Sequence, residues 1–346
     1  MTPSVLPISR VPDPMDAPPL AWGILAPGGI AAQFTHALRS FTRQRVVAVG
    51  SRSAERAQEF AARFDIPRAH DSYEALVADP NVAAVYVASP HSEHHAHALL
   101  AIEAGKHVLV EKALARNADE AKAMADAARD RGVLLMEAMW TRFLPRTDIV
   151  RQLLADGALG ELHTLIADHG QALPSVPRLH DPALAGGALL DLGVYPVSFA
   201  CFALGLPGRV TGTGVLTPTG VDAQVSICLD RFAAHPNAQA SLHTTLRVRT
   251  PTTAAICGTA ARIELDGTSF YNPGRVRLVT PDGVATQSPA PELTGHQAMA
   301  YEGAHAAQLV ADGLTASPWL PPDESVAIMG VLDDLRAQVG VRYPGE

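Results

Sequence analysis

The chain of 346 residues contains only three cysteines, Cys201, Cys228 and Cys257. They lie far apart and form neither a Cys-x-x-Cys motif nor an even set, which argues against a disulfide framework. Such sparse cysteine usage is typical of a reducing compartment, so we expect a cytoplasmic protein.

Excess positive charge and long apolar runs are also missing. The formal net charge of −8 argues against partners such as nucleic acid or an anionic membrane. We find no continuous apolar stretch of 18 residues, so we expect no membrane span. Residues 1–19 are rich in proline and lack the apolar core of a secretory signal, so we expect a flexible or strapped arm.

The remaining composition is that of a globular protein. Hydrophobic residues make up 47% of the chain and charged residues 18%, which excludes a disordered protein. The length suits two domains.

Residues 20–139 alternate between short apolar runs and stretches with helical periodicity. The expected strands are 21–25, 45–49, 83–88, 107–110 and 133–136, and the expected helices are 30–40, 54–64, 94–104 and 118–131. Gly105 and Gly132 stand where helices end. This alternation predicts an α/β Rossmann domain with a doubly wound parallel sheet.

The pattern changes in residues 140–346, which we expect to form a second domain. Alternating strands follow one another, separated by turns that contain proline and glycine, which predicts an open, mostly antiparallel sheet covered by helices. The expected strands are 162–169, 210–216, 221–229, 238–248, 252–256 and 261–265, and the expected helices are 146–155, 189–204, 301–314 and 323–339.

The first strand leads into the segment 26–31, Ala-Pro-Gly-Gly-Ile-Ala, which resembles a dinucleotide-binding turn. Gly28 and Ala31 match the second and third positions of the Gly-x-Gly-x-x-Gly/Ala pattern, and Ala26 replaces the first glycine. We expect Gly28, Gly29 and Ile30 to contact a pyrophosphate at the helix N-terminus. A ligand-free turn is the alternative reading.

The second strand ends without the acidic residue that usually holds the ribose hydroxyls of NAD. Ser51 and Arg52 stand there instead and suit a 2′-phosphate, so NADP is the expected cofactor, with NAD possible. The alternative is that Arg52 is solvated and Ser53 caps the next helix.

The third apolar run ends at Ser89-Pro90-His91. We expect Ser89 and His91 to lie near the nicotinamide half of the cofactor, with His91 also near the substrate. His94, His95 and His97 follow on a helix, but a glutamate at the Zn-protease spacing is missing. A structural role is favoured for them, and no metal is expected.

The fourth apolar run ends at Glu111-Lys112, where ligands bind in a parallel sheet. A surface ion pair is the simpler interpretation of a Glu-Lys dipeptide. Hydride transfer at an alcohol carbon needs a proton acceptor, and a tyrosine can serve when an ammonium favours its phenolate. Tyr195 is the candidate partner for Lys112, with Asp191 four residues earlier on the same helical face. A buried core tyrosine is the alternative.

Four segments together resemble the glucose-fructose oxidoreductase/inositol dehydrogenase family, and most closely its dihydrodiol dehydrogenase branch. They are 88–91 (Ala-Ser-Pro-His), 104–112 (Ala-Gly-Lys-His-Val-Leu-Val-Glu-Lys), 136–143 (Met-Glu-Ala-Met-Trp-Thr-Arg-Phe) and 186–196 (Gly-Gly-Ala-Leu-Leu-Asp-Leu-Gly-Val-Tyr-Pro).

The resemblance implies NAD(P)-dependent oxidation or reduction of sugars, cyclitols or dihydrodiols, and a homodimer formed through the second sheet. It implies that Lys112 is the catalytic lysine and Tyr195 the acid/base. Glu111 would lie beside the cofactor, and Asp191 and Trp140 beside the substrate. Trp140 and Phe143, three residues apart, could stack on an apolar ring or a sugar face, and a role in the core is the alternative.

Two positions depart from the family pattern. Ala113 stands where the family usually has proline after the lysine, and Ala26-Pro27 alters the phosphate loop. These departures keep a second hypothesis open, a regulatory protein that binds NADP(H) without turnover. A metal-dependent hydrolase built on the histidines is the third.

Overall fold

The computed structural model describes residues 5–265 and 269–346. Their contacts divide them into two compact units. The first unit holds residues 12–143 and 295–329, and the second holds the other described residues. This division differs from the domain boundaries expected from sequence, because helix α8 (Met299–Ala311) packs against α1 (Gly29–Phe41) of the first unit.

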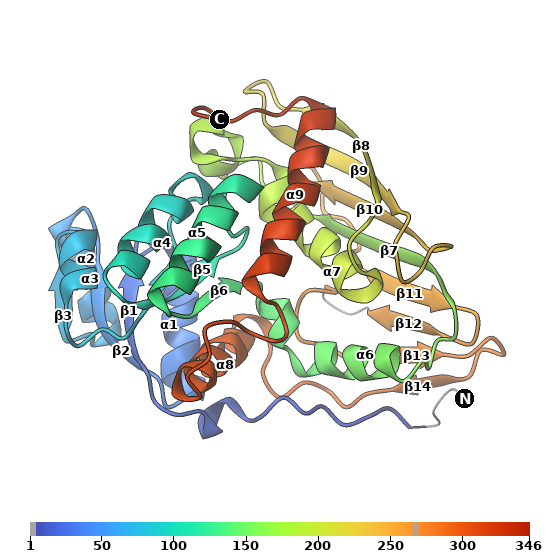
Figure 1. Ribbon diagram of the computed structural model, residues 1–346, viewed down its shortest axis with the longest axis horizontal. Helices are drawn as coiled ribbons and strands as arrows, with labels where there is room; N and C mark the ends of the chain where they lie inside the picture. Colours follow the sequence, from blue (N-terminus) through green and yellow to red (C-terminus); the bar gives the residue numbers. More distant parts are fainter. Residues whose placement is uncertain (1–4, 266–268) are drawn as a thin grey trace. The chain divides into compact units, whose positions relative to one another are not determined.

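A parallel sheet forms the centre of the first unit (Figure 1). In the described residues it has six strands in the order β3-β2-β1-β4-β5-β6, which confirms the doubly wound sheet predicted from sequence. The strands are β1 (Ala21–Leu25), β2 (Arg45–Gly50), β3 (Arg68–His70), β4 (Ala84–Val87), β5 (His107–Glu111) and β6 (Leu135–Ala138). Sequence analysis missed β3, so the apolar run before Lys112 is the fifth strand.

Helices connect these strands, and local capping explains where several begin and end. Asn117 caps the start of α5 by accepting a hydrogen bond from the Glu120 N–H, and Gly132 ends the helix at φ 66°. The helices besides α1 and α8 are α2 (Ala54–Phe64), α3 (Tyr73–Ala78), α4 (His94–Glu103), α5 (Ala118–Arg131) and the start of α9 (Pro322–Val339). Figure 1 shows α4 and α5 side by side.

The second unit is built on a mixed sheet. Its strand order in the described residues is β14-β13-β12-β11-β7-β10-β9-β8, and only the β7–β10 pair is parallel, so the mostly antiparallel prediction is confirmed. The strands are β7 (Leu162–Gly170), β8 (Arg209–Leu216), β9 (Asp222–Asp230), β10 (Gln239–Thr245), β11 (Ala254–Gly258), β12 (Arg262–Leu265), β13 (Arg277–Val279) and β14 (Ala285–Gln287). The unit also contains α6 (Pro145–Ala155), α7 (Val194–Leu204) and most of α9.

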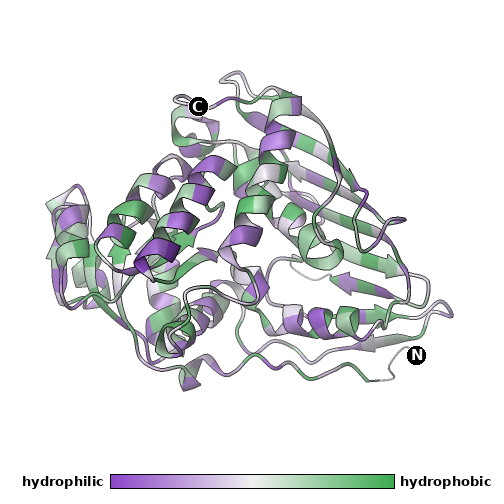
Figure 2. Cartoon of the chain, in the orientation of Figure 1, coloured by the Kyte–Doolittle hydropathy of each residue, from purple (hydrophilic) through white to green (hydrophobic). Residues whose placement is uncertain are grey.

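Helix α7 packs against β7 and β10, and its residues are almost entirely buried. The helical stretch Pro182–Leu204 is long and apolar enough to cross a membrane by length and composition, but 94% of its most apolar window is buried inside the structure. Such burial is typical of a core helix in a globular protein. Figure 2 shows that other helices, in contrast, carry both polar and apolar residues.

The first described residues of the expected N-terminal arm are hydrogen-bonded to α6. The Arg10 N–H donates to Asp148 Oδ2 at 2.7 Å, and the Arg10 guanidinium pairs with the same carboxylate. Gln152 donates to Ile8 O at 2.9 Å. Residues 5–11 are therefore strapped along α6, while residues 1–4 of the expected arm lie outside the described residues.

Candidate active site

The turn after β1 has the open backbone that a pyrophosphate needs. Ala26 adopts φ 66°, the left-handed region that the first glycine of the pattern usually occupies. Gly28 precedes α1, and a Cβ atom added at Gly28 or Gly29 would meet nothing within 4 Å. The uncharged first turn of α1 presents its N-terminus there. These residues fit a dinucleotide phosphate, and Ile30 follows in the same turn.

The end of β2 combines a buried serine with an exposed arginine. The Ser51 hydroxyl accepts from the Ser53 N–H at 3.2 Å, and Ser53 caps α2 by accepting from the Arg56 N–H at 3.3 Å. The capping role of Ser53 is thus confirmed. Arg52 is exposed and lies close enough to Tyr73 to oppose the rise in the pKa of that phenol caused by burial. A role of Arg52 in binding a 2′-phosphate stays a prediction.

The histidines after β4 contact the main chain and neighbouring side chains. His91 Nε2 lies 3.2 Å from Lys112 O, and His97 Nδ1 lies 2.9 Å from the Ser89 hydroxyl. His94 lies between two backbone carbonyls. In the described residues there is no group of three or more histidine, cysteine, aspartate or glutamate side chains that could hold a metal.

Glu111 and Lys112 lie at the end of β5, as the sequence pattern predicts. The buried Glu111 carboxylate accepts hydrogen bonds from the Tyr86 hydroxyl and from the Lys112 N–H, the latter at 3.2 Å. The Lys112 side chain is half-buried, and the Lys112–Ala113 peptide bond is cis. The structure therefore brings Glu111, Lys112 and His91 together at one strand end.

The two aromatic residues proposed for the substrate pocket differ in their surroundings. Trp140 is 5% exposed and stacks on His296 with ring centroids 5.9 Å apart. Phe143 is fully buried and packs against His305 and Trp319. Contact with substrate stays a prediction for both, and the burial of Phe143 gives it a clear packing role.

In the second unit, Asp191 and Tyr195 lie at the start of the α7 helix. The turn Leu189–Gly193 is a π-helix, so the α-helix expected from residue 189 begins only at Val194. This widened turn is a feature often found at functional sites. Asp191 is buried and pairs with Arg178, with Oδ1 and Nη2 3.1 Å apart.

Tyr195 is surrounded by rings that the sequence analysis did not identify. Its ring centroid lies 5.2 Å from that of His169 and 4.9 Å from that of Tyr271. His169 Nδ1 lies 3.2 Å from Leu192 O, and the Gln171 amide contacts both His169 Nε2 (3.0 Å) and the Tyr271 hydroxyl (3.2 Å). The position of His169 near the end of β7 could have marked it as a candidate site residue. Tyr271 follows a stretch of sequence in which no strand was expected, so no pattern marked it.

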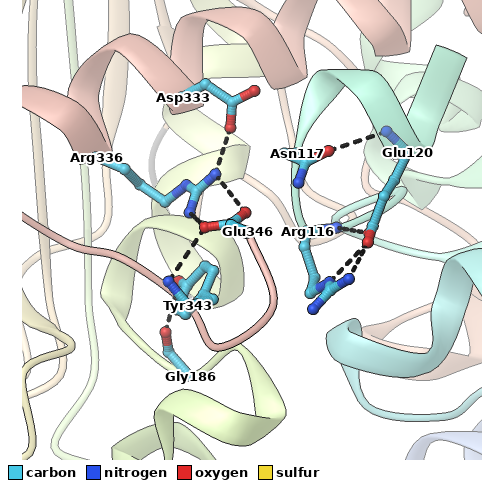
Figure 3. A network of polar contacts seen from close by, with 8 residues as sticks. All are labelled: Arg116, Asn117, Glu120, Gly186, Asp333, Arg336, Tyr343 and Glu346. Carbon is cyan, nitrogen blue, oxygen red and sulfur yellow. Dashed lines mark hydrogen bonds and ion pairs between the residues drawn. The ribbon is translucent and has the colours of Figure 1, made fainter.

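The glycine turn before Asp191 is fixed by distant residues. The Tyr343 hydroxyl donates to Gly186 O at 2.7 Å, and the Tyr343 ring lies against Arg336, which pairs with Glu346 (Figure 3). Gly187 adopts φ 121°. The segment that carries Asp191 and Tyr195 therefore begins from a tightly held turn.

The buried carboxylate of Asp222 holds the same segment. Its Oδ2 accepts from the Leu189 N–H at 2.6 Å. Burial raises the pKa of Asp222 to about 6, which the hydrogen bonds from backbone N–H groups partly oppose. Lys112 lies in the first unit and Tyr195 in the second, so their pairing stays a prediction.

Comparison with known proteins places this architecture in a family. Residues 20–139 match the model described as "Oxidoreductase family, NAD-binding Rossmann fold", and residues 148–264 match the GFO/IDH/MocA C-terminal domain. The chain is 37% identical over 333 residues to trans-1,2-dihydrobenzene-1,2-diol dehydrogenase of Macaca fuscata fuscata, which covers 94% of this chain and 98% of that one. The chain belongs to the GFO/IDH/MocA oxidoreductase family. The resemblance expected from the four segments is thereby confirmed.

Solved structures with this fold cover most of the chain. A 3-ketoreductase from Actinomadura kijaniata in complex with TDP-benzene and NADP matches with a TM-score of 0.79 and 27% identity, covering 93% of this chain and 98% of that one. A levoglucosan dehydrogenase in complex with NADH matches with a TM-score of 0.84 and 21% identity, covering 93% and 97%. One of these structures contains NADP and the other NADH, so the comparison does not select between NADP and NAD.

Proposed function

We propose that this protein is an NADP-dependent dehydrogenase that transfers hydride between nicotinamide and a cyclic hydroxyl or carbonyl substrate, such as a sugar, a cyclitol or a trans-dihydrodiol. The observation that carries the proposal is the 37% identity to a dihydrodiol dehydrogenase across 94% of the chain, because it spans both units. Gly28 and Gly29 would receive the pyrophosphate. The preference for NADP is supported by the exposed Arg52 after β2.

When bound, the dinucleotide would supply the hydride acceptor or donor. In the oxidative direction Tyr195 takes the hydroxyl proton of the substrate, and the Lys112 ammonium favours the phenolate that accepts it. Asp191 orients the substrate, and Arg178 keeps the Asp191 carboxylate in place. Trp140 would cover the ring of the substrate, since a flat aromatic face suits an apolar ring or the face of a sugar.

The proposal extends to assembly and location. It includes a homodimer or higher homo-oligomer formed through the second sheet, on which Ile166 and Val215 are 53% and 44% accessible. The three cysteines are free thiols, which supports a cytoplasmic location. Light scattering on a sizing column measures the assembly directly.

The central experiment compares the natural protein with Lys112→Met and Tyr195→Phe on a panel of sugars, cyclitols and trans-dihydrodiols, with NADP and NAD in parallel. We expect turnover with NADP and a loss of about 10²- to 10⁴-fold in kcat for each variant, since each removes a proton-transfer group or its support. Circular dichroism checks that the fold is retained.

Turnover that survives Lys112→Met in a folded protein would contradict the mechanism. Tight NADPH binding without turnover of any panel member would instead favour the regulatory protein. Activity that disappears on chelator treatment and returns with a divalent metal would favour the hydrolase hypothesis.

A further inference from the structure

Side chains contact the main chain of Lys112 from both sides. The Lys112 N–H donates to Glu111 Oε2 at 3.2 Å, and Lys112 O lies 3.2 Å from His91 Nε2. Both partners are buried, at 7% and 5% exposure. The backbone that carries this lysine is therefore held by groups that do not belong to the sheet hydrogen bonds.

The next two residues are held in the same way. Ala113 O lies 2.9 Å from His94 Nδ1. The Leu114 N–H donates to Glu137 Oε1 at 3.1 Å, while the Ser325 hydroxyl donates to the other oxygen of that carboxylate at 2.7 Å. A loop would normally leave such groups to water, so this degree of side-chain contact indicates that the path of the loop matters.

His94 has a special place in this arrangement because it also contacts the neighbouring strand end. Its Nε2 lies 2.8 Å from Ser89 O, while Nδ1 faces Ala113 O. The ring is fully buried. It therefore spans two loops, the one after β4 that carries Ser89 and His91 and the one after β5 that carries Lys112, which are neighbours in the parallel sheet.

We propose that His94 is a positioning residue that holds the Lys112 loop in register with the Ser89 loop and so places the ammonium for proton transfer. This inference rests on the role proposed above for Lys112. The neutral ring carries one N–H and donates it to one of the two carbonyls, while its rigid body sets the separation of the two loops, a gap that a shorter side chain does not fill. Misplacement of a catalytic group by about 1 Å can cost on the order of 100-fold in rate.

His94→Asn tests the inference, with His95→Asn as the matched control on the same helix. His95 is half-buried, and its ring is not among those that contact the Lys112 loop in the described structure. We expect His94→Asn to lower kcat by about 10- to 100-fold. The dissociation constant for NADPH, measured by fluorescence, should stay within about 3-fold, since His94 lies outside the phosphate turn.

The pH profile separates positioning from mere stabilisation. If the ammonium moves away, the phenol of Tyr195 becomes harder to ionise. The acid limb of kcat/KM for oxidation should then move to higher pH in His94→Asn and stay unchanged in His95→Asn. Hydrogen exchange over residues 107–117 should be faster in His94→Asn than in the natural protein.

The possible outcomes distinguish a failure of this inference from a failure of the proposed function. If Lys112→Met abolishes turnover but folded His94→Asn keeps kcat within about 2-fold and an unshifted pH profile, the positioning role is wrong while the function stands. If Lys112→Met leaves turnover intact, the proposed role of Lys112 is wrong and this inference falls with it, whereas absence of turnover in the natural protein would overturn the proposed function. Should His94→Asn not fold, the longer amide of His94→Gln replaces it, and the same kcat and pH profile decide.

Discussion

In each unit, side chains hold the main chain next to a predicted catalytic residue, Lys112 in the first unit and Tyr195 in the second. These contacts differ in sequence separation and in chemistry. In the first unit, His94 contacts Ala113 O from 19 positions away in the sequence. In the second, Asp222 and Tyr343 hold the turn before Tyr195 from 33 and 157 positions away. The contact from His94 is thus nearer in the sequence than those in the second unit, although Ser325 also supports the Lys112 loop through Glu137.

The two supports also differ in chemistry. Both His94 and Asp222 are fully buried, and burial disfavours the charged form of each. It lowers the pKa of His94 to about 4, with the Lys112 and His97 charges adding to the effect. It raises the pKa of Asp222 to about 6, against the effect of Arg336. The same physical cause therefore makes the two supports respond to pH in opposite directions.

The largest effect should come from Gly187→Ala in the second unit. A Cβ atom at this position would lie 2.2 Å from Asp222 Oδ1, and φ 121° is a conformation that alanine rarely adopts. We expect a loss of about 2–5 kcal/mol in the free energy of unfolding, from overpacking and backbone strain together. Urea unfolding followed by tryptophan fluorescence measures it.

Gly205→Ala is the matched control at the other end of α7. Gly205 adopts φ 86°, and an added Cβ would meet nothing within 4 Å. It should therefore lose about 1–3 kcal/mol, from the backbone alone, and less than Gly187→Ala. Equal losses in the two variants would show that Asp222 does not hold the glycine turn.

The opposite pH responses can be measured with Asp222→Asn and His94→Asn. Folded Asp222 keeps its proton up to about pH 6. Its contribution to the free energy of unfolding is therefore full below the unfolded pKa of 3.8 and is lost as pH rises through 6. Folded His94 stays neutral down to about pH 4, so its contribution is full above 6.5 and is lost as pH falls through 4. The contribution of each group to the free energy of unfolding changes by about 3 kcal/mol across its pH range.

Relative to the natural protein, the stability deficit of Asp222→Asn should shrink as pH rises from 4 to 6.5, and that of His94→Asn should grow. Urea unfolding at four pH values in this range gives both differences. Arg336 and Tyr343 face Asp222, and Lys112 and His97 face His94, so these neighbours stay unchanged in both variants. Deficits that change in the same direction would remove the contrast between the units.

Burial also explains which strands could be predicted from the sequence. β1 and β5 are predictable because their residues are apolar and almost wholly buried. β3 is only three residues long and partly exposed, and β13 and β14 are equally short, so none has an apolar run to reveal it. Burial on both faces is what makes a parallel strand visible in sequence.

The candidate site follows the same rule. The position of Lys112 at a strand end was predictable because it directly follows a buried parallel strand. Tyr195 could be placed only on a helix, and its neighbours His169 and Tyr271 come together through sheet pairing and a loop that no local pattern encodes. The π-turn at Leu189–Gly193 likewise depends on the hydrogen bond from Leu189 to Asp222.

The smallest effect, and one of opposite sign, should come from Ala26→Gly in the first unit. In the turn after β1 Ala26 adopts φ 66°, with its N–H bonded to Gly50 O at 3.2 Å, whereas Gly187 in the second unit adopts φ 121° without a Cβ atom. A left-handed conformation costs a residue with a Cβ atom about 1–2 kcal/mol, and the larger unfolded-state entropy of glycine offsets part of the gain. We therefore expect Ala26→Gly to raise the free energy of unfolding by about 0.5–1 kcal/mol in urea titrations. A variant less stable than the natural protein would mean that the Ala26 methyl group packs well enough to outweigh the backbone cost, and that the two units do not differ in strain at these turns.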